Sequence, residues 1–502
     1  MKIVDLDRIH TIINVDRNKH KIVLCHGVFD LLHIGHIKYF EEAKTFGDIL
    51  VVTLTPDRFV NKGPMRPVFP EQLRAEAIAA LEVVDFVCIN QLPDAIKTIE
   101  LIKPDYYVKG SDYKNYSDDI TGMIEKEANA VHFNGGQIIF TSDITFSSST
   151  LLNNHFSTLN DEQFAFIHNL KKNYSFEDIK DFIIKLNNLK VLVIGETIID
   201  EYVFCDTVGK SGKEPVLVNK KLSSEKYAGG VIAVANHLSA FSNKVDVLSY
   251  IGDRDDHLTF IEKNINSNVT FKYIIKQNSP TILKTRFLDK YSNTKIAAIY
   301  DINDSFLNEI EEKDFCMKLE EKINSYDLIL SVDYGHGLIT PKVVTLLQDK
   351  SKYLVANTQL NSFNSDYHVI SKYNNLNSVC VHEGELRHNY RDRHTSVKEL
   401  AQKLYESLKL ESIIITRGNN GSLGYSNGEY VNCPAFANKI VDRVGAGDTF
   451  LAIVSLCLSC NIPFDLSLFL GNLAGAQMVA NIGTGLKLDK ISMLKTIDTL
   501  LK

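Results

Sequence analysis

The strongest constraint on the fold of this chain is a pattern that occurs twice, in which short β-rich runs alternate with amphipathic helical stretches. The first series lies between about residues 20 and 150 and contains KIVLC, DILVVTL, DFVCIN, DYYVKG and GGQIIFT. The second begins with KVLVIG at residue 190 and continues through VDVLSYIG, YDLILSVD, YLVANT, SVCVHE and SIIITRG. Strands that alternate with helices build parallel sheets. The pattern therefore predicts an α/β protein with two domains.

The stretch between the two series, residues 153–187, is polar and helix-leaning and contains no glycine. It predicts a helical connector. We therefore expect a Rossmann-like domain over residues 1–153, a connector over residues 154–187 and a second α/β domain over residues 188–502. A length of 502 residues suits two large α/β units.

Composition and charge exclude several classes of function. The chain has 62 acidic and 55 basic residues and no block of like charge, so the usual footprint of nucleic-acid binding is absent. No apolar run is long enough for a membrane helix, and the first residues lack a signal peptide's apolar region, so we expect a cytoplasmic protein. The eight cysteines are scattered, and the CxxC at Cys457 and Cys460 lies in an apolar helical run that predicts core packing. The expected partners are small molecules.

A first candidate site follows the first predicted strand, where LCHGVFDLLHIGHIKYF leads into a helix. His33 and His36 are three residues apart at the start of that helix, so both rings can reach one phosphate group. Hydrogen-bond donors fixed beside an α-phosphate stabilise the charge that develops during nucleotidyl transfer. The alternative interpretation is a pair of helix-start histidines that bond to nearby backbone.

Together with Lys62 and Gly63 ahead of RPV, VKGSDYK at residues 108–114 and SSST at residues 147–150, this motif resembles the cytidylyltransferase-like nucleotidyltransferases and their HxGH signature. Within that family the chain is most similar to the adenylyltransferase half of the bifunctional heptose-phosphate kinase/adenylyltransferases. The resemblance implies that His33, His36 and Lys62 are catalytic. It also implies a nucleotide site formed by Gly27, Phe29, Lys44, Lys109, Gly110, Asp112, Ser148, Ser149 and Thr150.

One departure from that family concerns the segment TSDITFSSST, which has no basic residue where relatives that use glycerol phosphate carry an arginine. It argues against glycerol phosphate and leaves both ATP and CTP open as the nucleotide. Apart from the family, Lys44 and Lys62 fit ordinary surface lysines equally well, and Ser148–Thr150 fit a helix N-cap.

A second candidate site is the segment DRVGAGDTF, which precedes a long apolar helix. The small residues Gly445, Ala446 and Gly447 let main-chain amides approach an anion at the helix N-terminus. Asp448 beside that anion can accept the proton of an acceptor hydroxyl while a γ-phosphate is held in line. The alternative interpretation is a tight turn with an aspartate N-cap.

VLVIGETIIDEY, Gly229 and Gly230, SVDYGHG at residues 331–337, ITRGNNG at residues 415–421 and the GAGD segment together resemble the ribokinase/PfkB sugar kinases. The resemblance covers about residues 188–490 and implies a ribokinase-like α/β sandwich with a small β lid that uses ATP and Mg²⁺. It implies that Asp448 is the catalytic base and that Glu385 holds the metal. The implied sugar-binding residues are Asp200, Gly229 and Gly230, and the implied nucleotide-binding residues are Thr416, Gly418, Gly421, Gly445, Ala446 and Gly447.

This second motif set also departs from its family. Ala233 stands in GGVIA where a sugar-binding asparagine is expected, and His382 stands in HEGE where the NxxE motif has asparagine. Three hypotheses follow. The leading one is a bifunctional enzyme of nucleotide-sugar synthesis for lipopolysaccharide or capsule, which phosphorylates a heptose-phosphate-like sugar and then transfers AMP or CMP with release of pyrophosphate. The first rival is an active nucleotidyltransferase with a degenerate, ligand-binding kinase domain, and the second is a nucleotide-sensing binding protein that catalyses no reaction. A homodimer through the small lobe fits any of them, and the sugar, the base and any effector are not determined by the sequence.

Overall fold

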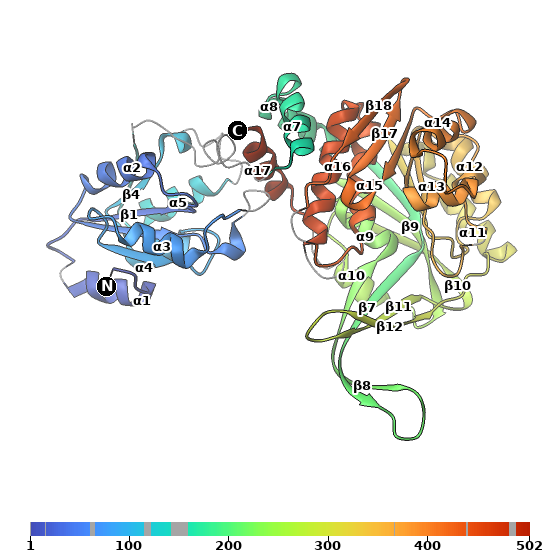
Figure 1. The fold of residues 1–502 in the computed structure, drawn as a ribbon, viewed down its shortest axis with the longest axis horizontal. Helices are drawn as coiled ribbons and strands as arrows, with labels where there is room; N and C mark the ends of the chain where they lie inside the picture. The colour runs from blue at the N-terminus through green and yellow to red at the C-terminus, as the bar shows by residue number, and fades with distance from the viewer. Residues whose placement is uncertain are drawn as a thin grey trace. The chain divides into compact units, whose positions relative to one another are not determined.

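The computed structural model describes residues 2–15, 17–60, 66–114, 122–141, 159–365, 367–437, 440–480 and 488–502 (Figure 1). The chain forms two compact units. The first comprises Met1–Asp161 with Ile491–Lys502, and the second comprises Glu162–Lys490. The predicted connector contains the helices α7 (Asp161–Asn173) and α8 (Phe176–Lys185). The domain boundaries at residues 153 and 188 stay predictions.

The first unit contains a parallel sheet with the strand order β3-β2-β1-β4-β5 in its described residues. The order places β1 in the middle, where β2 and β4 both pair with it. The crossover connections on the two sides of β1 leave in opposite directions. The carboxyl end of β1 therefore lies at a crevice in the sheet edge. The strands are β1 (Ile22–Gly27), β2 (Ile49–Leu54), β3 (Phe86–Ile89), β4 (Tyr106–Lys109) and β5 (Gln137–Phe140).

Helices cover both faces of this sheet because its strands are apolar on both sides. Val23 and Cys25 belong to one buried cluster, together with residues of α2 and α3. Ile22 and Leu24, which point the other way, belong to a cluster with residues of α1, α4 and α5. The helices are α1 (Leu6–Val15), α2 (Ile34–Lys44), α3 (Glu71–Ala79), α4 (Ile96–Ile102) and α5 (Met123–Phe133).

The second unit is built around a central sheet with the order β10-β9-β6-β13-β14-β15-β16-β17-β18 in the part of the chain that is described. Strand pairs are parallel from β10 to β16, and β17 and β18 continue the sheet antiparallel. The strands are β6 (Lys190–Gly195), β9 (Lys244–Arg254), β10 (Val269–Pro280), β13 (Leu328–Asp333), β14 (Leu354–Thr358), β15 (Ser378–His382), β16 (Ser412–Thr416), β17 (Ser422–Ser426) and β18 (Glu429–Cys433).

A separate sheet with the order β12-β11-β7-β8 forms the lid of this unit, and its β7–β8 hairpin extends far from the central sheet (Figure 1). β7 follows β6 almost directly, so the lid is tied to the middle of the central sheet. Most side chains of β8 are exposed. The strands are β7 (Thr197–Lys210), β8 (Leu217–Gly229), β11 (Ile282–Asp289) and β12 (Lys295–Asp301).

Helices flank the central sheet on both sides, with α9, α15 and α16 on one side and α11 to α14 on the other (Figure 1). α15 and α16 are apolar around most of their surface, as expected for helices buried in a large core. The helices are α9 (Gly230–Leu238), α10 (Leu258–Asn264), α11 (Glu309–Glu320), α12 (Pro341–Lys350), α13 (Glu383–Tyr390), α14 (Val397–Ser407), α15 (Ala446–Ser459) and α16 (Phe464–Val479). α17 (Lys490–Leu501) ends the described chain.

These sheets confirm the predicted fold class, an α/β chain with a parallel Rossmann-like sheet ahead of a second α/β sandwich and its small β lid. Among the described helices, none is both long and apolar enough to cross a bilayer. Cys457 is fully buried inside α15, as its apolar setting predicts.

Candidate active sites

The predicted histidine pair lies at the N-terminus of α2, directly after β1 and its connecting loop. His33 is the N-cap of the helix, and its Nδ1 accepts a hydrogen bond from the backbone N–H of Gly35 at 3.1 Å. The rings of His33 and His36 stack with centroids 4.0 Å apart. Partial burial lowers the pKa of His33, so its ring is neutral near pH 7. Because Nδ1 accepts, the ring proton lies on Nε2, which can donate to a phosphate.

Phe29 supports this pair from the β1–α2 loop. Its ring meets the ring of His36 edge-on at 5.3 Å, and its backbone has a positive φ of 48°. A Cβ atom at Gly27 would come within 2.9 Å of the Phe29 ring, so glycine is required for this packing. The structure therefore brings together Gly27, Phe29, His33 and His36, as predicted for one site. Their roles in binding and catalysis stay predictions.

Asp30, which the sequence motif contains but the prediction did not use, fixes the segment that follows residue 65. Its carboxylate accepts hydrogen bonds from the backbone N–H groups of Val68 at 2.6 Å and Phe69 at 3.2 Å, and it pairs with Arg66 at 3.4 Å. Both side chains of the ion pair are almost fully buried. A buried carboxylate must be hydrogen-bonded or paired with a cation. This chemical requirement is the signal by which Asp30 could have been found.

Lys109, predicted to contact the nucleotide, forms a buried ion pair with Glu127 of α5 at 3.0 Å. Glu127 also accepts hydrogen bonds from the Tyr107 hydroxyl at 2.9 Å and from the backbone N–H of Ala95 at 3.1 Å. Burial of the ring, followed by the charge on Lys109, lowers the pKa of the neighbouring His26 to about 4. The charge of Lys109 is therefore already compensated inside the unit.

Lys44 is not brought together with the histidines. It lies at the last turn of α2, where its ammonium bonds the carboxylate of Asp85, the residue just before β3. That position is at the amino edge of the sheet, whereas His33 follows its carboxyl edge. Gly110 caps the short turn Ser111–Tyr113, which contains the backbone of Asp112. Lys62, Ser148, Ser149 and Thr150 lie outside the described residues.

In the second unit, Asp448 lies in the first turn of α15, after Gly445, which is the N-cap with a φ of 83°. Burial, followed by the nearby carboxylate of Asp200, raises the pKa of Asp448 to about 6, while Tyr334 and Lys284 act in the opposite direction. A Cβ atom at Gly447 would meet nothing within 4 Å, so the backbone there is open to an approaching group. Ala446 begins the helix between these glycines.

Asp200 of β7 forms an ion pair with Arg286 of β11, and both side chains are mostly buried. A Cβ atom at Gly229 would lie 2.2 Å from Oδ2 of Asp200, so glycine is required beside this carboxylate. Gly230, with a φ of 53°, starts α9 next to it. Thus Asp200, Gly229 and Gly230 meet, as the resemblance implies for a sugar site.

Lys284 and Arg286, which sequence reasoning missed, supply positive charge to this site. Lys284 is 7% exposed, and burial lowers the pKa of its ammonium, while the charges of Asp200 and Asp448 raise it. The signal that could have found them is the spacing in KTRF, because alternate residues of a strand point to the same face.

Glu385, the predicted metal ligand, accepts hydrogen bonds from the backbone N–H groups of His382 at 2.6 Å and Leu360 at 3.2 Å. Burial, with a contribution from Asp448, raises its pKa to about 7. His382 is the N-cap of α13, and its Nδ1 accepts from the N–H of Gly384. The His382 ring thus stabilises the first turn of α13 as its N-cap.

The donor set at Glu385 fits Mg²⁺. Carboxylate oxygens have further lone pairs beyond those used by backbone donors, so Glu385 keeps acceptor capacity for a cation or its waters. Within the described residues, no group of three or more His, Cys, Asp or Glu side chains could hold a metal alone. Mg²⁺ normally takes most ligands from phosphates and water and only one or two from carboxylates.

The predicted nucleotide turn begins at Thr416, the last residue of β16, which pairs with His382 at the end of β15. Gly418 and Gly421 both have positive φ, and a Cβ atom at Gly421 would lie 2.1 Å from the Cys433 carbonyl oxygen. The turn is therefore tight and adjoins the HEGE motif.

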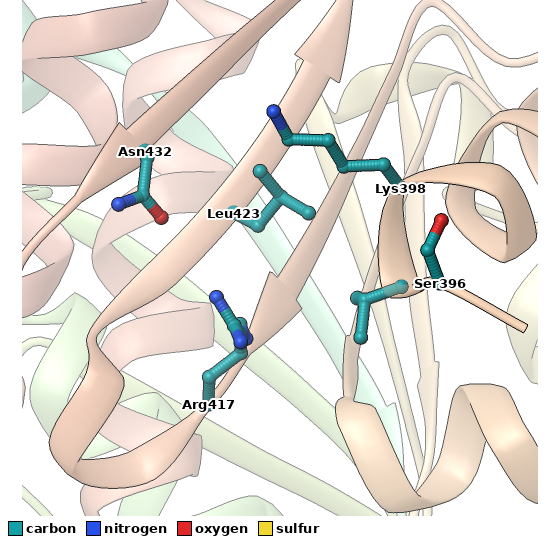
Figure 2. A pocket seen from close by; sticks show the side chains of 6 residues that line it. Ser396, Lys398, Arg417, Leu423 and Asn432 are labelled. Carbon is teal, nitrogen blue, oxygen red and sulfur yellow. The ribbon is translucent and has the colours of Figure 1, made fainter. Parts of the chain in front are cut away.

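A cavity of about 330 Å³ adjoins this turn at Arg417 (Figure 2). Lys398 and Arg417 approach it from α14 and from the end of β16, and Arg417 also pairs with Glu383 at 3.1 Å. None of the residues predicted to bind the nucleotide lines it. The lining residues are Ser396, Val397, Lys398, Arg417, Leu423 and Asn432.

The chain is similar to curated relatives and to solved structures. The chain is 27% identical over 313 residues to the "Bifunctional protein HldE" of Campylobacter jejuni, which covers 62% of this chain and 65% of that protein. It is 29% identical over 315 residues to the protein of the same name from Helicobacter pylori strain G27, covering 61% and 66%. The chain thus spans about 65% of the length of these relatives. Phosphofructokinase-2 from Escherichia coli, solved in complex with potassium, shares the fold with a TM-score of 0.51, at 16% identity over 62% of this chain and all of that one.

Family models match both halves of the chain and confirm the two resemblances. Residues 24–155 match the cytidylyltransferase-like family, and residues 188–491 match the pfkB family carbohydrate kinases. The second match covers more than half of the 502 residues. The chain therefore belongs to the pfkB family of carbohydrate kinases and carries a cytidylyltransferase-like domain ahead of its kinase domain.

Proposed function

We propose that this chain catalyses two successive steps of nucleotide-sugar synthesis. The kinase unit phosphorylates a sugar or sugar phosphate of the heptose-phosphate type with ATP. The N-terminal unit then transfers AMP from ATP, or CMP from CTP, to a sugar phosphate and releases pyrophosphate. Two family matches in one chain, and relatives named as bifunctional, support this pairing.

The observation that carries the kinase proposal is the meeting of Asp448 and Asp200 at the N-terminus of α15. Asp200 orients a sugar hydroxyl, and Asp448, with a pKa near 6, is ionised at neutral pH and accepts its proton. The oxygen then forms a bond to the γ-phosphorus while the bond to the β-γ bridging oxygen breaks, and ADP leaves. Backbone amides of residues 445–447 and the helix N-terminus stabilise the phosphoryl oxygens.

Charge compensation in this reaction comes from groups around the two aspartates. Mg²⁺, when bound, neutralises the phosphates of ATP. Glu385 would hold the ion or its waters, and Thr416, Gly418 and Gly421 would contact the nucleotide. Arg286 pairs with Asp200, and Lys284 and Arg286 together attract an anionic substrate, which favours a sugar phosphate as acceptor.

In the transferase unit, His33 and His36 bind the α-phosphate region of the nucleotide from the N-terminus of α2. The Nε2–H of His33 donates to a phosphate oxygen because Nδ1 is held by Gly35. An oxygen of the sugar phosphate attacks the α-phosphorus, the bond to the β-phosphate oxygen breaks, and pyrophosphate leaves. Lys62, Ser148, Ser149 and Thr150 are proposed to complete this site.

The kinase proposal is tested by ADP release with ATP, Mg²⁺ and a panel of sugars and sugar phosphates. We expect turnover with a sugar phosphate and a loss of at least a hundredfold in Asp448→Asn. Asp465→Asn, which alters a carboxylate near the start of α16, is the matched control and keeps activity. Absence of turnover with every substrate would instead support the rival function, in which Ala233 and His382 mark a ligand-binding domain that does not transfer phosphate.

The transferase proposal is tested by pyrophosphate release from each nucleoside triphosphate with the same sugar phosphates. His36→Ala should lower kcat by about a hundredfold or more, since it removes a donor to the reacting phosphate. His10→Ala, at a half-buried position on α1, is the control. Unchanged release in His36→Ala contradicts the assignment.

We further propose that the protein acts in the cytoplasm, where nucleoside triphosphates are available.

We also propose that the protein forms a homodimer through the lid sheet. Side chains of β8 and β12 leave an apolar surface uncovered, including Leu217, Val218, Leu222 and Ile299. Leu217→Glu with Leu222→Glu should convert a sedimenting dimer to a monomer. A wild-type monomer at micromolar concentration contradicts the dimer.

A further inference from the structure

Arg74 of α3 has a guanidinium group inside the transferase unit, and its side chain is only 1% exposed. Nε donates a hydrogen bond to the carbonyl oxygen of Phe69 at 3.0 Å, and Nη1 donates to the carbonyl oxygen of Val28. Nη2 donates to the carbonyl oxygen of Thr55 at 3.0 Å and pairs with the carboxylate of Asp57 at 2.6 Å. A buried charge is costly unless it is bonded in this way, so Arg74 and its acceptors hold one another in place.

The acceptors of Arg74 come from three different loops of the transferase unit. Val28 directly follows β1, Thr55 directly follows β2, and Phe69 lies just before α3. The first two loops are also joined to each other, because the N–H of Thr55 donates to the carbonyl oxygen of Gly27 at 3.0 Å. The loop after β1 is the one that leads to the histidine pair. Arg74 therefore ties that loop to two neighbouring loops.

Phe29 lies between two residues at which the loop after β1 is held. On one side of it, the Val28 carbonyl accepts from Arg74, and on the other, the Asp30 carboxylate accepts from the N–H of Phe69 at 3.2 Å. The carbonyl of Phe69 also accepts from Arg74, so both loops are fastened to the same guanidinium group. The φ of 48° at Phe29 is rare for a residue with a side chain and persists only where neighbouring bonds impose it.

We propose that Arg74 is a positioning residue for nucleotidyl transfer, which fixes the backbone on both sides of Phe29 so that the Phe29 ring orients His36 toward the α-phosphate. The inference rests on the proposed transferase function. The ring of Phe29 meets the ring of His36 edge-on at 5.3 Å, so a shift of Phe29 changes the support of His36. Because the bonds of Arg74 go to the loops, it acts on His36 through Phe29.

The test compares Arg74→Lys and Arg74→Gln with the wild type in the full chain, with pyrophosphate release as the measurement. Lys keeps the charge, but one ammonium group cannot reach carbonyls on three loops as the planar fork does. Gln brings no charge into the interior, and the Asp57 side chain is 38% exposed and can be solvated, so this variant should fold. We expect both variants to lower kcat about tenfold with little change in KM for the nucleotide, because a misaligned His36 loses bonds that strengthen in the transition state.

Two control variants separate this role from a general effect on the fold. Arg58→Lys changes an exposed arginine that donates to the carbonyl oxygen of Gln91 at 2.8 Å, and it should keep the kinetics of the wild type. Ile99→Ala opens space in the cluster on the opposite face of the sheet, so it should lower thermal stability and keep kcat. An unchanged kcat in both Arg74 variants, or an equal loss of kcat in Ile99→Ala, would overturn the proposal.

A double variant tests whether Arg74 acts through Phe29. Phe29→Leu removes the ring that meets His36 and should itself lower kcat. If Arg74 only positions that ring, adding Arg74→Gln to Phe29→Leu should lower kcat no further, because the two changes remove the same support. Losses of kcat that multiply in the double variant would show that Arg74 acts by another route and would contradict the inference.

A second measurement needs no turnover, so it separates this inference from the transferase function. In protein with ¹³Cε1-labelled histidine, the NMR signal lost in His36→Ala identifies His36. In Arg74→Gln that signal should move toward its position in Phe29→Leu, because the aromatic ring leaves its place beside His36, and in Ile99→Ala it should stay. A His36 signal unchanged in Arg74→Gln refutes the link even if the transferase is active, and a moved signal supports it even if no nucleotide is transferred.

Discussion

Burial and a neighbouring carboxylate can shift the pKa of a single residue in the kinase unit. The contribution of that residue to the stability of the fold then depends measurably on pH. Asp448 has a pKa raised to about 6 in the folded chain by burial and by Asp200. Its usual value in an unfolded chain is about 4. A carboxyl whose folded pKa is raised is destabilising when ionised, so the penalty grows as the pH rises from about 4 to 6 and is complete above 6.

Asp448→Asn should therefore stabilise the kinase unit at pH 8 by roughly 1 to 2 kcal/mol, although it abolishes phosphoryl transfer. The gain should shrink as the pH falls and vanish near pH 4, because the wild-type carboxyl is then protonated as well. Urea unfolding at pH 5, 6.5 and 8 measures it. An equal effect at all three values would show that Asp448 does not carry the raised pKa.

The ion pair between Lys109 and Glu127 gives a prediction for the transferase unit. Lys109→Met leaves a buried carboxylate without its partner and should cost about 3 to 5 kcal/mol of stability. Lys109→Met combined with Glu127→Gln should recover a large part of that loss. Thermal unfolding of the wild type, the single variant and the double variant measures these differences. A single variant as stable as the wild type would indicate that Lys109 serves the nucleotide instead.

The residue scale also shows what the sequence can and cannot predict. His33 and His36 were correctly expected at one helix start, because adjacent positions in the chain determine a strand-to-helix junction. Lys109 lies in an equally suggestive motif, but its partner Glu127 comes from a later helix. A local sequence pattern cannot predict this ion pair, because the pair depends on how α5 packs against the sheet.

At the scale of elements, the turn from β8 into α9 is packed so closely that it tolerates no side chain. Gly229 faces the carboxylate of Asp200, and the two residues come from strands that pair in the lid. The parallel strands of both units were predictable from their apolar runs. The lid strands β7, β8, β11 and β12 were expected only from the family, and the exposed, polar-rich residues of β8 carry a weak strand pattern.

Gly229→Ala should displace Asp200 and raise KM for the sugar at least tenfold, because a Cβ atom would lie 2.2 Å from its carboxylate oxygen. Gly212→Ala is the matched control in the loop between β7 and β8, where a Cβ atom meets nothing within 4 Å. Its kinetics should equal those of the wild type. If both variants behave alike, Asp200 does not contact the sugar.

At the scale of the whole molecule, the two units each have a sheet and a core of their own, so they should fold separately. The helices α7 and α8 belong to the kinase unit. The Gln163 side chain donates a hydrogen bond to the carbonyl oxygen of Ala435, and the Tyr174 hydroxyl donates one to the carboxylate of Asp465. A boundary drawn from sequence patterns alone could not assign them, because such contacts join residues more than 250 positions apart.

A fragment of residues 162–490, the extent of the second unit, should therefore fold and phosphorylate the sugar with the kcat of the full chain. A fragment of residues 188–490, which lacks α7 and α8, should be less stable because the apolar residues of α16 that α7 contacts become exposed. Thermal unfolding and ADP release measure both. Equal stability of the two fragments would mean that the helices are no part of the kinase unit.

The capping role of His33 has a consequence for how such a protein can change over evolutionary time. One ring nitrogen serves folding by holding the first turn of α2, and the other serves chemistry. Replacement by asparagine, a good N-cap, would preserve the helix and remove the phosphate donor. A lineage could thus lose the reaction in a single step and inherit an intact domain, ready to be recruited as a sensor.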